Sequence, residues 1–509
     1  MGAAVRPGGS WSWTALLVTE WLIRVLLIAR ILSRRCPGPE SLGWIVLIAL
    51  VPLIGLTTYV LLGERQLGLS RVRRHDEFEQ QLVPGVKGQG AAQASTHPTQ
   101  EWWARAGPCQ QLAKAAEAVT GLEPTSGNEL ELIDHAPALL ERLAIDIDAA
   151  EHHVHMIYYI VGQSESCVKV YEALERASAR GVVCRFMADH VGSLAFFRSS
   201  WPARLQAAGV RVQRGLAVNI FRRRLHRIDL RNHRKIAVID GAIGYCGSQN
   251  LLDERVRTRR VPLRKRPLLD ANVRARGPCV RDLQLSFLAD WLTGHPEHDR
   301  ETQELTGDGA YLRTPERAGS SVVHVIPSGP LSRTDAIHQS IKTMLNVAHK
   351  SVVMTTPYFV PDEALKASII NASLRGVDVT LILPAHLDNY TVAAAARAHF
   401  AQLLESGVRI MQHVPHKADL DSGGLLHSKC AVVDDEAVMI GSANLDMRSF
   451  WINFECTLLI YDEAMARDLK RLHERYLGES VRINPAVWAK RTWWQNLRDN
   501  AAQLLAPLL

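Results

Sequence analysis

Residues 427–444 read HSKCAVVDDEAVMIGSAN, and this stretch decides the fold because the chain contains its pattern twice. A histidine and a lysine stand two residues apart, an aspartate follows, and a Gly-Ser-x-Asn turn closes the stretch. Residues 233–250, HRKIAVIDGAIGYCGSQN, repeat the pattern, and every shared position differs in number by 194. Neither copy has therefore gained or lost a residue, which predicts a duplicated architecture.

Each copy predicts a β-hairpin. A four-residue apolar run meets a turn signal, Asp240-Gly241 in the first copy and Asp434-Asp435 in the second, and another short strand follows. Side chains two apart on a strand share a face, so each motif histidine projects beside its lysine, and each serine beside its asparagine. The two aspartates have the opposite parity and stand at the turn. This position predicts a structural role for them, accepting hydrogen bonds from turn amides.

The residue types suit phosphoryl transfer. Histidine, with a pKa near ~6.5, can attack phosphorus as the free imidazole or donate a proton as the imidazolium. Lysine, serine and asparagine can hold the non-bridging oxygens, where charge gathers in the transition state. Two copies supply one nucleophile and one acid, and no metal or other cofactor is needed. The candidate catalytic set is His233, Lys235, Asp240, His427, Lys429 and Asp434, with Ser248, Asn250, Ser442 and Asn444 as phosphate ligands.

The doubled pattern HxK(x)4D(x)6GSxN resembles the phospholipase D superfamily. Longer strings resemble one branch of it, the bacterial cardiolipin synthases: residues 59–64 (YVLLGE), 326–330 (IPSGP), 356–361 (TPYFVP), 441–450 (GSANLDMRSF) and 453–455 (NFE). The resemblance implies that a phosphatidyl group passes from one phosphatidylglycerol to another, giving cardiolipin and glycerol. Water or another alcohol as acceptor would make the same site a hydrolase or a different transferase, and a nuclease would use the same residues. The arginine-rich residues 255–266 depart from the family and leave the acceptor alcohol open.

The expected mechanism is a two-step, ping-pong transfer through a phosphohistidine. By resemblance, His233 is the nucleophile and His427 the acid and base, although the repeat makes either role available to either histidine. Each imidazole needs an acid on its second nitrogen. We expect Glu455, 28 residues after His427, to orient His427, and Asp270, 37 residues after His233, to orient His233.

Strands and helices alternate around both motifs, which predicts an α/β fold. Two repeated phospholipase D-like domains, residues 105–310 and 311–482, would each hold a mostly parallel sheet with helices on both faces. The two motifs would then meet at one shared cleft. Residues 67–104 are interpreted as a linker.

The two ends of the chain carry apolar segments. Residues 1–66 predict a membrane anchor of two transmembrane helices, since residues 41–63 carry no charge and a crossing needs about 20 residues. Arginines flanking the pair outnumber those between them, which puts both ends and the catalytic body on the cytoplasmic side of the bacterial inner membrane. The amphipathic tail, residues 483–509, allows either an interfacial helix or packing against the second domain.

The formal net charge is +7, which favours anionic partners: phosphatidylglycerol and anionic membrane lipid. The basic run 253–266, extended by residues 221–224, would gather headgroups at the site or be a solvated loop. Few aromatic residues interleave it, so no nucleic acid is expected.

The eight scattered cysteines are interpreted as reduced core residues. His152, His153 and His155 lack a further ligand and are interpreted as polar residues at a strand edge rather than a metal site. The sequence assigns no oligomeric state.

Overall fold

The computed structural model of the chain describes residues 10–33, 38–59, 63, 72–73, 75, 96–216, 229–253, 256–257, 265–266, 268–294, 305, 310–330, 335–387, 389–414 and 424–506. It separates into two units, each with its own internal contacts: residues 1–68 with 220–229, and the rest of the chain. Most of the basic run 253–266, all of residues 221–224 and most of the linker lie outside the described residues.

The N-terminal unit contains the helices α1 (Ser10–Leu32), α2 (Gly38–Leu50) and α3 (Pro52–Thr58). The sequence predicts one helix across residues 41–63, but the helix breaks at Val51 because Pro52 has no amide hydrogen and instead starts α3. Among the described residues, no helix is both long enough and apolar enough to cross a membrane.

The larger unit is built on one mixed sheet of 15 strands. From edge to edge they are β21 (Ser480–Arg482), β15 (Arg409–His413), β14 (Asp378–Pro384), β12 (Ser351–Thr355), β17 (Cys430–Val433), β18 (Ala437–Gly441), β20 (Glu455–Tyr461), β11 (Ser321–Ser328), β1 (Thr125–Ile133), β10 (Asn272–Arg276), β6 (Ile243–Gly247), β5 (Ile236–Ile239), β2 (His153–Tyr158), β3 (Val183–Asp189) and β4 (Arg211–Gly215).

The prediction of mostly parallel sheets is wrong. Within the large sheet only the pairs β2–β3, β3–β4, β12–β14 and β14–β15 are parallel. These outer strands are joined by crossover helices, as parallel neighbours must be. The motif hairpins β5–β6 and β17–β18 and all strands between them pair antiparallel.

The two halves share this sheet instead of forming separate ones. Seven strands of the first half, β4 to β1, match seven of the second, β15 to β11, in mirrored order, and β21 is an addition at one edge. The halves join where β1 pairs antiparallel with β11, in a register that places Thr125 opposite Val323. The two motifs are therefore held at fixed places in one hydrogen-bonded framework.

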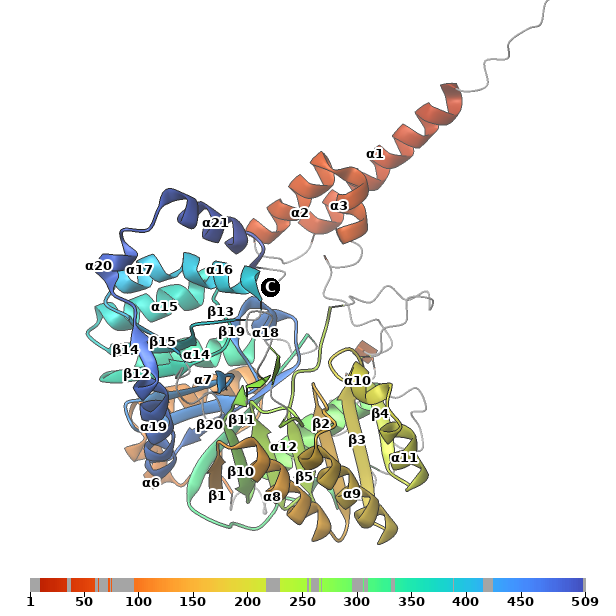
Figure 1. The fold of residues 1–509 in the computed structure, drawn as a ribbon, viewed down its shortest axis with the longest axis vertical. Helices are drawn as coiled ribbons and strands as arrows, with labels where there is room; N and C mark the ends of the chain where they lie inside the picture. Colours follow the sequence, from red (N-terminus) through yellow and green to blue (C-terminus); the bar gives the residue numbers. More distant parts are fainter. Residues whose placement is uncertain are drawn as a thin grey trace, which may run out of the picture. The chain divides into compact units, whose positions relative to one another are not determined.

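Helices cover both faces of the sheet (Figure 1). They are α7 (Pro108–Thr120), α8 (Ala136–Asp148), α9 (Glu165–Ala179), α11 (Trp201–Ala207), α12 (Cys279–Gly294), α14 (Ala336–Val347), α15 (Glu363–Leu374), α16 (Tyr390–Ala398), α17 (Phe400–Glu405) and α19 (Glu463–Gly478). On one face, α8, α9 and α11 bury the core of the first half, and α7, α14, α15 and α17 that of the second. On the other face, α12 and α19 share one core that runs across both halves. Although α7 falls in the range expected for the first domain, it packs in the core of the second half.

The short elements of the unit include α6 (Gln100–Arg105), α10 (Leu194–Phe197), α18 (Met447–Trp451), α20 (Pro485–Trp488), α21 (Trp493–Gln503), β9 (Leu268–Leu269), β13 (Phe359–Val360), β16 (Leu425–Leu426) and β19 (Leu445–Asp446). In the C-terminal tail, α21 lies over α16 on the side away from the sheet (Figure 1). The seven described cysteines are buried and form no disulfide, which confirms the prediction for them.

Candidate active site

Backbone hydrogen bonds join each motif histidine to the opposite half of the chain. The amide of His233 donates to the carbonyl of Phe454 over 2.8 Å, and the amide of His427 donates to the carbonyl of Leu269 over 2.9 Å. Short strands reinforce the second contact, since β16, directly before His427, pairs in parallel with β9. Phe454 and Leu269 are the residues immediately before the two candidate orienting acids. These backbone contacts therefore place each acid beside the histidine of the other half.

The side chains follow this crossed arrangement. Nδ1 of His427 lies 2.7 Å from Oδ1 of Asp270, and Nδ1 of His233 lies 3.2 Å from Oε1 of Glu455. The sequence predicts the same two acids but pairs each with the histidine of its own half, and that pairing is wrong. The predicted pairing rested on the short separation along the chain, whereas the shared sheet brings strands of opposite halves together. In both pairs the acid is at Nδ1, which leaves Nε2 as the reactive nitrogen.

The motif serines hold the acids. Oγ of Ser248 donates to Oδ1 of Asp270 over 2.6 Å, and Oγ of Ser442 donates to Oε2 of Glu455 over 2.5 Å. Both serines are buried. The sequence predicts contacts from these hydroxyls to phosphate oxygens, but the hydroxyl hydrogens are already used on the carboxylates. We therefore assign Ser248 and Ser442 to fixing the acids rather than to binding phosphate.

Burial sets the electrostatics of the two pairs. The side chains of His233 and His427 are 19% and 21% exposed, while those of Glu455 and Asp270 are 0% and 2% exposed. Burial lowers the pKa of both histidines below the ordinary value, against the opposing effect of the carboxylates. Burial also disfavours the Asp270 anion, but His427 and Lys429 outweigh it and lower the pKa of Asp270 to about 2. At neutral pH the site thus holds an ionised Asp270 beside histidines that lose their protons readily.

The motif lysines lie in the same electrostatic cluster. Nζ of Lys235 donates to the carbonyl of His233 over 2.6 Å, and Nζ of Lys429 donates to the carbonyl of His427. Burial lowers the pKa of Lys235 to about 8 and that of Lys429 to about 7, while Asp270 and Glu455 raise both. Each acid therefore acts on the lysines of both motifs, which places all of these groups in one site.

The motif asparagines follow the serines by two residues and have different contacts. Oδ1 of Asn250 accepts a hydrogen bond from the amide of Ile160 over 3.1 Å. Oδ1 of Asn444 is buried and has no hydrogen-bond partner among the described residues. The structure holds no phosphate, so the role of Asn250 and Asn444 as phosphate ligands stays a prediction.

The motif aspartates bind the backbone, away from the histidines. Asp240 accepts hydrogen bonds from the amides of Glu151, His152 and His153 over 2.7–2.8 Å. Asp434 makes the equivalent three bonds, 2.7–2.8 Å long, to the amides of residues 349–351. The sequence predicts bonds to turn amides, but the donors are the first residue of the neighbouring strand, β2 or β12, and the two residues before it. Both aspartates have φ of 53°, a left-handed conformation that aspartate tolerates at turns.

Sequence reasoning missed a buried arginine between His233 and Lys235. Nη1 of Arg234 lies 2.8 Å from Oδ1 of Asp290 on α12. Its other nitrogens donate to the carbonyls of Glu455 and Ser328, each over 3.0 Å. Arg234 thus ties the first motif to two strands of the second half. The second motif has Ser428 at this position, and this asymmetry within the HxK pattern was the available signal.

Two neighbours of His233 were also missed. Nδ2 of Asn453 lies 3.2 Å from Nδ1 of His233 and donates to Oε1 of Glu455 over 3.4 Å. The ring of Tyr159 packs on the His233 imidazole with centroids 4.0 Å apart. Both contacts restrict the orientation of the ring.

The interpretation as polar residues at a strand edge is wrong for His153 and His155, whereas His152 is exposed and directly precedes β2. β2 lies between β3 and β5, and His153 and His155 are buried with ring centroids 4.6 Å apart. Nδ1 of His155 lies 2.7 Å from Nε2 of Gln284, and its Nε2 lies 3.0 Å from Nη1 of Arg185. The part of the chain that the structure describes contains no group of three or more possible metal ligands.

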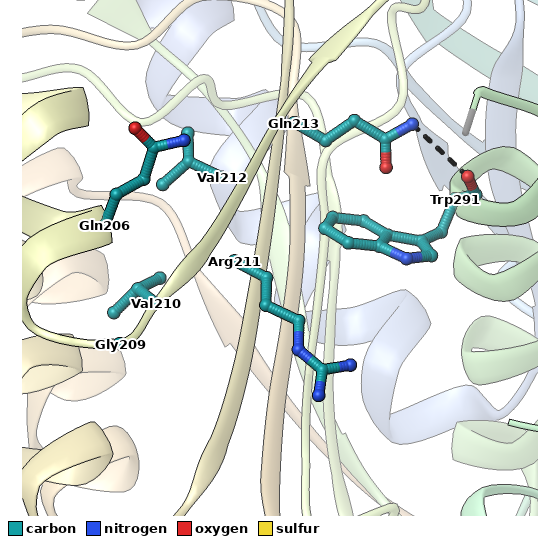
Figure 2. Close-up of a pocket in the computed structure, with 7 residues that line it drawn as sticks. All are labelled: Gln206, Gly209, Val210, Arg211, Val212, Gln213 and Trp291. Carbon is teal, nitrogen blue, oxygen red and sulfur yellow. Dashed lines mark hydrogen bonds between the residues drawn. The ribbon is translucent and has the colours of Figure 1, made fainter. Parts of the chain in front are cut away.

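Two cavities lie elsewhere in the fold. One of about 360 Å³ lies between β4 and α12, where Nε2 of Gln213 donates to the carbonyl of Trp291 (Figure 2). A larger one, of about 950 Å³, includes His153 and Asp240 in its lining. Neither is lined by His233 or His427, and the smaller one contains no carboxylate or histidine.

A duplicated α/β half with two histidine-acid pairs is the architecture of phospholipase D-like enzymes. A family model described as "Cardiolipin synthase, PLD-like domain" matches residues 143–260 and 341–477. Proteins named cardiolipin synthase A from Erwinia tasmaniensis and Shigella flexneri are each 35% identical to this chain, with 98% of both chains covered. The chain belongs to the cardiolipin synthase family of the phospholipase D superfamily.

A solved structure is similar in fold. The crystal structure of phosphatidylserine synthase from Haemophilus influenzae matches with a TM-score of 0.55 and 15% sequence identity, covering 78% of this chain and all of that one. At this identity the likeness concerns the fold alone.

Proposed function

We propose that this chain is a membrane-bound phosphatidyltransferase that makes cardiolipin from two phosphatidylglycerol molecules and releases glycerol. The observation that carries the proposal is the pair of crossed contacts, His427 with Asp270 and His233 with Glu455. They supply two imidazoles, each with Nδ1 on a buried carboxylate and with no hydrogen-bond partner at Nε2 among the described residues. Relatives that carry the name cardiolipin synthase A match over nearly the whole chain and support the choice of substrate.

In the first step, Nε2 of His233 attacks the phosphorus of phosphatidylglycerol and forms the P–N bond. The P–O bond to glycerol breaks, and the imidazolium of His427 donates its proton to the departing oxygen. Asp270 stabilises that imidazolium. Glu455 accepts a hydrogen bond from Nδ1 of His233, which fixes the tautomer in which Nε2 carries the lone pair.

In the second step, His427 acts as a base instead of an acid, and His233 becomes the leaving group. His427, now neutral, takes the proton from a hydroxyl of a second phosphatidylglycerol. That oxygen attacks phosphorus, the P–N bond breaks, and His233 is regenerated. Lys235 and Lys429, with Asn250 and Asn444, would hold the non-bridging oxygens while charge gathers on them. All bonds and protons balance without a cofactor.

The substrates are membrane lipids, and we propose the N-terminal unit as the membrane anchor. The exposed side chains of α1 include Trp13, Leu17, Trp21 and Leu26, an apolar surface on a helix that also carries Glu20 and Arg24. Nη2 of Arg24 lies 2.6 Å from Oε1 of Glu20, which lowers the cost of placing both groups in a lipid environment. The arginine distribution favours a cytoplasmic active site in a bacterial inner membrane.

The test is the product profile of the purified full-length chain in phosphatidylglycerol vesicles. We expect cardiolipin and glycerol in equal amounts, and a loss of about 10⁴-fold or more for His233→Asn and His427→Asn, as for members of one catalytic set. Phosphatidic acid as the main product would make the chain a hydrolase. A tenth of wild-type cardiolipin formation in either variant would contradict the two-histidine mechanism.

A further inference from the structure

The C-terminal helix α21 buries its small and polar side and exposes its bulky apolar side. The residues that face inward are Asp499, Ala502, Gln503 and Ala506, which recur at helical spacing as one stripe. The exposed large apolar residues of the helix and the turn after it are Trp493, Trp494, Leu497, Leu504 and Leu505. A helix on the surface of a water-soluble domain normally has the opposite distribution.

A polar contact fixes the helix in this orientation. The Asp499 side chain is buried, and its carboxylate lies 3.1 Å from Nε of Arg397 on α16. Arg491, two residues before α21, and Arg498, within it, bind the same carboxylate. Rotating α21 to bury its apolar side would carry Asp499 away from Arg397 on α16 and break that ion pair, so the apolar side is held outward.

The outward side has the chemistry of a lipid interface. Trp493 is 64% exposed and Trp494 is 72% exposed, and their rings meet edge to face with centroids 4.4 Å apart. Exposed basic side chains flank them: Lys490 precedes the helix, and Arg498 lies beside Leu497. Tryptophan with lysine and arginine is the combination typical of helices that lie in the headgroup region of anionic membranes.

The helix lies close to the second motif. Its inward residues Ala502 and Ala506 belong to one apolar cluster with Val360, Tyr358 and Met447. Met447 comes three residues after Asn444. The two residues between them form β19, which pairs with β13. The tail therefore packs on the segment that directly follows the second motif.

We propose that the exposed side of α21, with the turn after it, is a docking surface for an anionic phospholipid bilayer that holds the active site against its lipid substrate. The proposal rests on the proposed function and adds a second membrane contact to the N-terminal unit. Among residues 485–506 the only acid is Asp499, which is buried, while Lys490, Arg491 and Arg498 are basic. A second copy of the chain on this surface would bring like charges together, whereas an anionic bilayer complements them.

The test compares two forms of the same substrate, using the full-length chain. The variant is Trp493→Ser with Trp494→Ser, and the matched control is Leu374→Ser, which removes an equally exposed apolar side chain at the end of α15 in the same half. Each protein is assayed on vesicles of phosphatidylglycerol diluted in phosphatidylcholine, and on a short-chain phosphatidylglycerol below its micellar concentration.

We expect the double variant to need at least about tenfold more phosphatidylglycerol in the vesicle surface for half-maximal rate, while its rate on the monomeric substrate stays within twofold of wild type. The control should match wild type in both assays. Equal behaviour of variant and wild type on vesicles would overturn the docking surface. Equal losses on both substrates would show a folding defect in place of docking and would also overturn it. A wild-type chain that forms no cardiolipin from either substrate would instead refute the proposed function.

A direct measurement complements the kinetics. Vesicles containing phosphatidylglycerol brominated on the acyl chains quench tryptophans that enter the bilayer. The variant Trp493→Phe with Trp494→Phe keeps the apolar surface but removes two of the 12 tryptophans. We expect the quenched fraction of the emission to fall in this variant relative to wild type. An unchanged quenched fraction, or self-association that disappears in the serine variant, would show that the surface does not meet lipid.

Discussion

Nδ1 of His427 lies 2.7 Å from Oδ1 of Asp270, although 157 residues separate them and they belong to opposite halves of the chain. His233 and Glu455 form the second crossed contact, 3.2 Å long and shared with Asn453. The two contacts differ in length and partners, so the halves are not equivalent chemically. This difference provides a way to tell the nucleophile from the acid.

We first predict opposite responses to a leaving group that needs no proton. Phosphatidyl-p-nitrophenol releases p-nitrophenolate without a general acid. Asp270→Asn should therefore lose about 10²–10⁴-fold on phosphatidylglycerol but keep most of the initial burst of p-nitrophenolate. Glu455→Gln, which impairs the nucleophile His233, should lose the burst as well as turnover. Stopped-flow absorbance measures the burst.

The reverse pattern, with the burst kept in Glu455→Gln, would make His427 the nucleophile. Glu455→Gln activity within threefold of wild type on phosphatidylglycerol would contradict the crossed pair itself.

We predict next that the motif aspartates contribute to stability and not to chemistry. Asp434→Asn keeps an oxygen acceptor and tolerates the positive φ, so turnover per folded molecule should stay within about tenfold of wild type. Asp434→Ala removes the acceptor for three amides and disfavours that φ, and we expect a loss of several kcal/mol of unfolding free energy. Thermal unfolding and active-site titration separate the two effects. A well-folded Asp434→Asn enzyme without turnover would contradict this assignment.

The buried pair of Arg234 and Asp290 gives a third prediction. Arg234→Met leaves a carboxylate buried without its cation, and such losses cost about 3–5 kcal/mol. Adding Asp290→Leu should recover part of the stability, and denaturant unfolding measures both variants. The control is Arg176→Met, whose ion pair with Asp148 is exposed and should matter by less than about 1 kcal/mol. Equal stability of Arg234→Met and the control would show that the buried pair contributes no more to stability than an exposed one.

The lysines predict an upper alkaline limit of activity, above the pH at which His427 loses the proton that it donates to the departing oxygen. Their pKa values of about 7 for Lys429 and about 8 for Lys235 mean that positive charge disappears as the pH rises through this range. We expect kcat/KM to fall there, because neutral lysines attract phosphate oxygens weakly. The pKa of His233 lies below 6.5, so its free-base form persists on the acidic side to lower pH. In Lys429→Arg, whose charge does not titrate, the alkaline fall should move toward 8. An unmoved fall would assign the limit to another group.

Chelation gives the last prediction. The proposed steps use only side chains of the protein, so dialysis of the full-length enzyme against a strong chelator should leave the rate unchanged. A rate that fell and then recovered on adding zinc or magnesium would contradict the mechanism.

The sequence was sufficient for the duplication, the hairpins and the identities of both orienting acids, because these depend on local pattern and spacing. It was not sufficient for the partner of each acid. Glu455 and Asp270 each lie closest along the chain to the histidine of their own half, and only the β1–β11 junction reverses that choice. The alternating pattern of helices and strands likewise says nothing of strand direction, which is why the central antiparallel strands were missed.

Other features depended on partners that no short segment displays. Whether the Ser248 hydroxyl meets a phosphate or a carboxylate is decided by Asp270, 22 residues away on the chain. The burial of Arg234 depends on its partner Asp290 on α12, which lies 56 residues further along the chain. For residues 483–509 the sequence left open an interfacial helix or packing on the second domain, and the contact of Asp499 with Arg397 shows which side of α21 packs.

The antiparallel junction of β1 with β11 also bears on the ancestry of the chain. Neither half contains a complete pair of histidine and acid, so a gene encoding one half alone could have been active only if two copies of its product met through that strand. Fusion of two such genes would turn a dimer interface into the middle of a single sheet. It would also allow the two halves to diverge, as the difference between Arg234 and Ser428 shows. A substitution at the acid of one half would still affect the histidine of the other half.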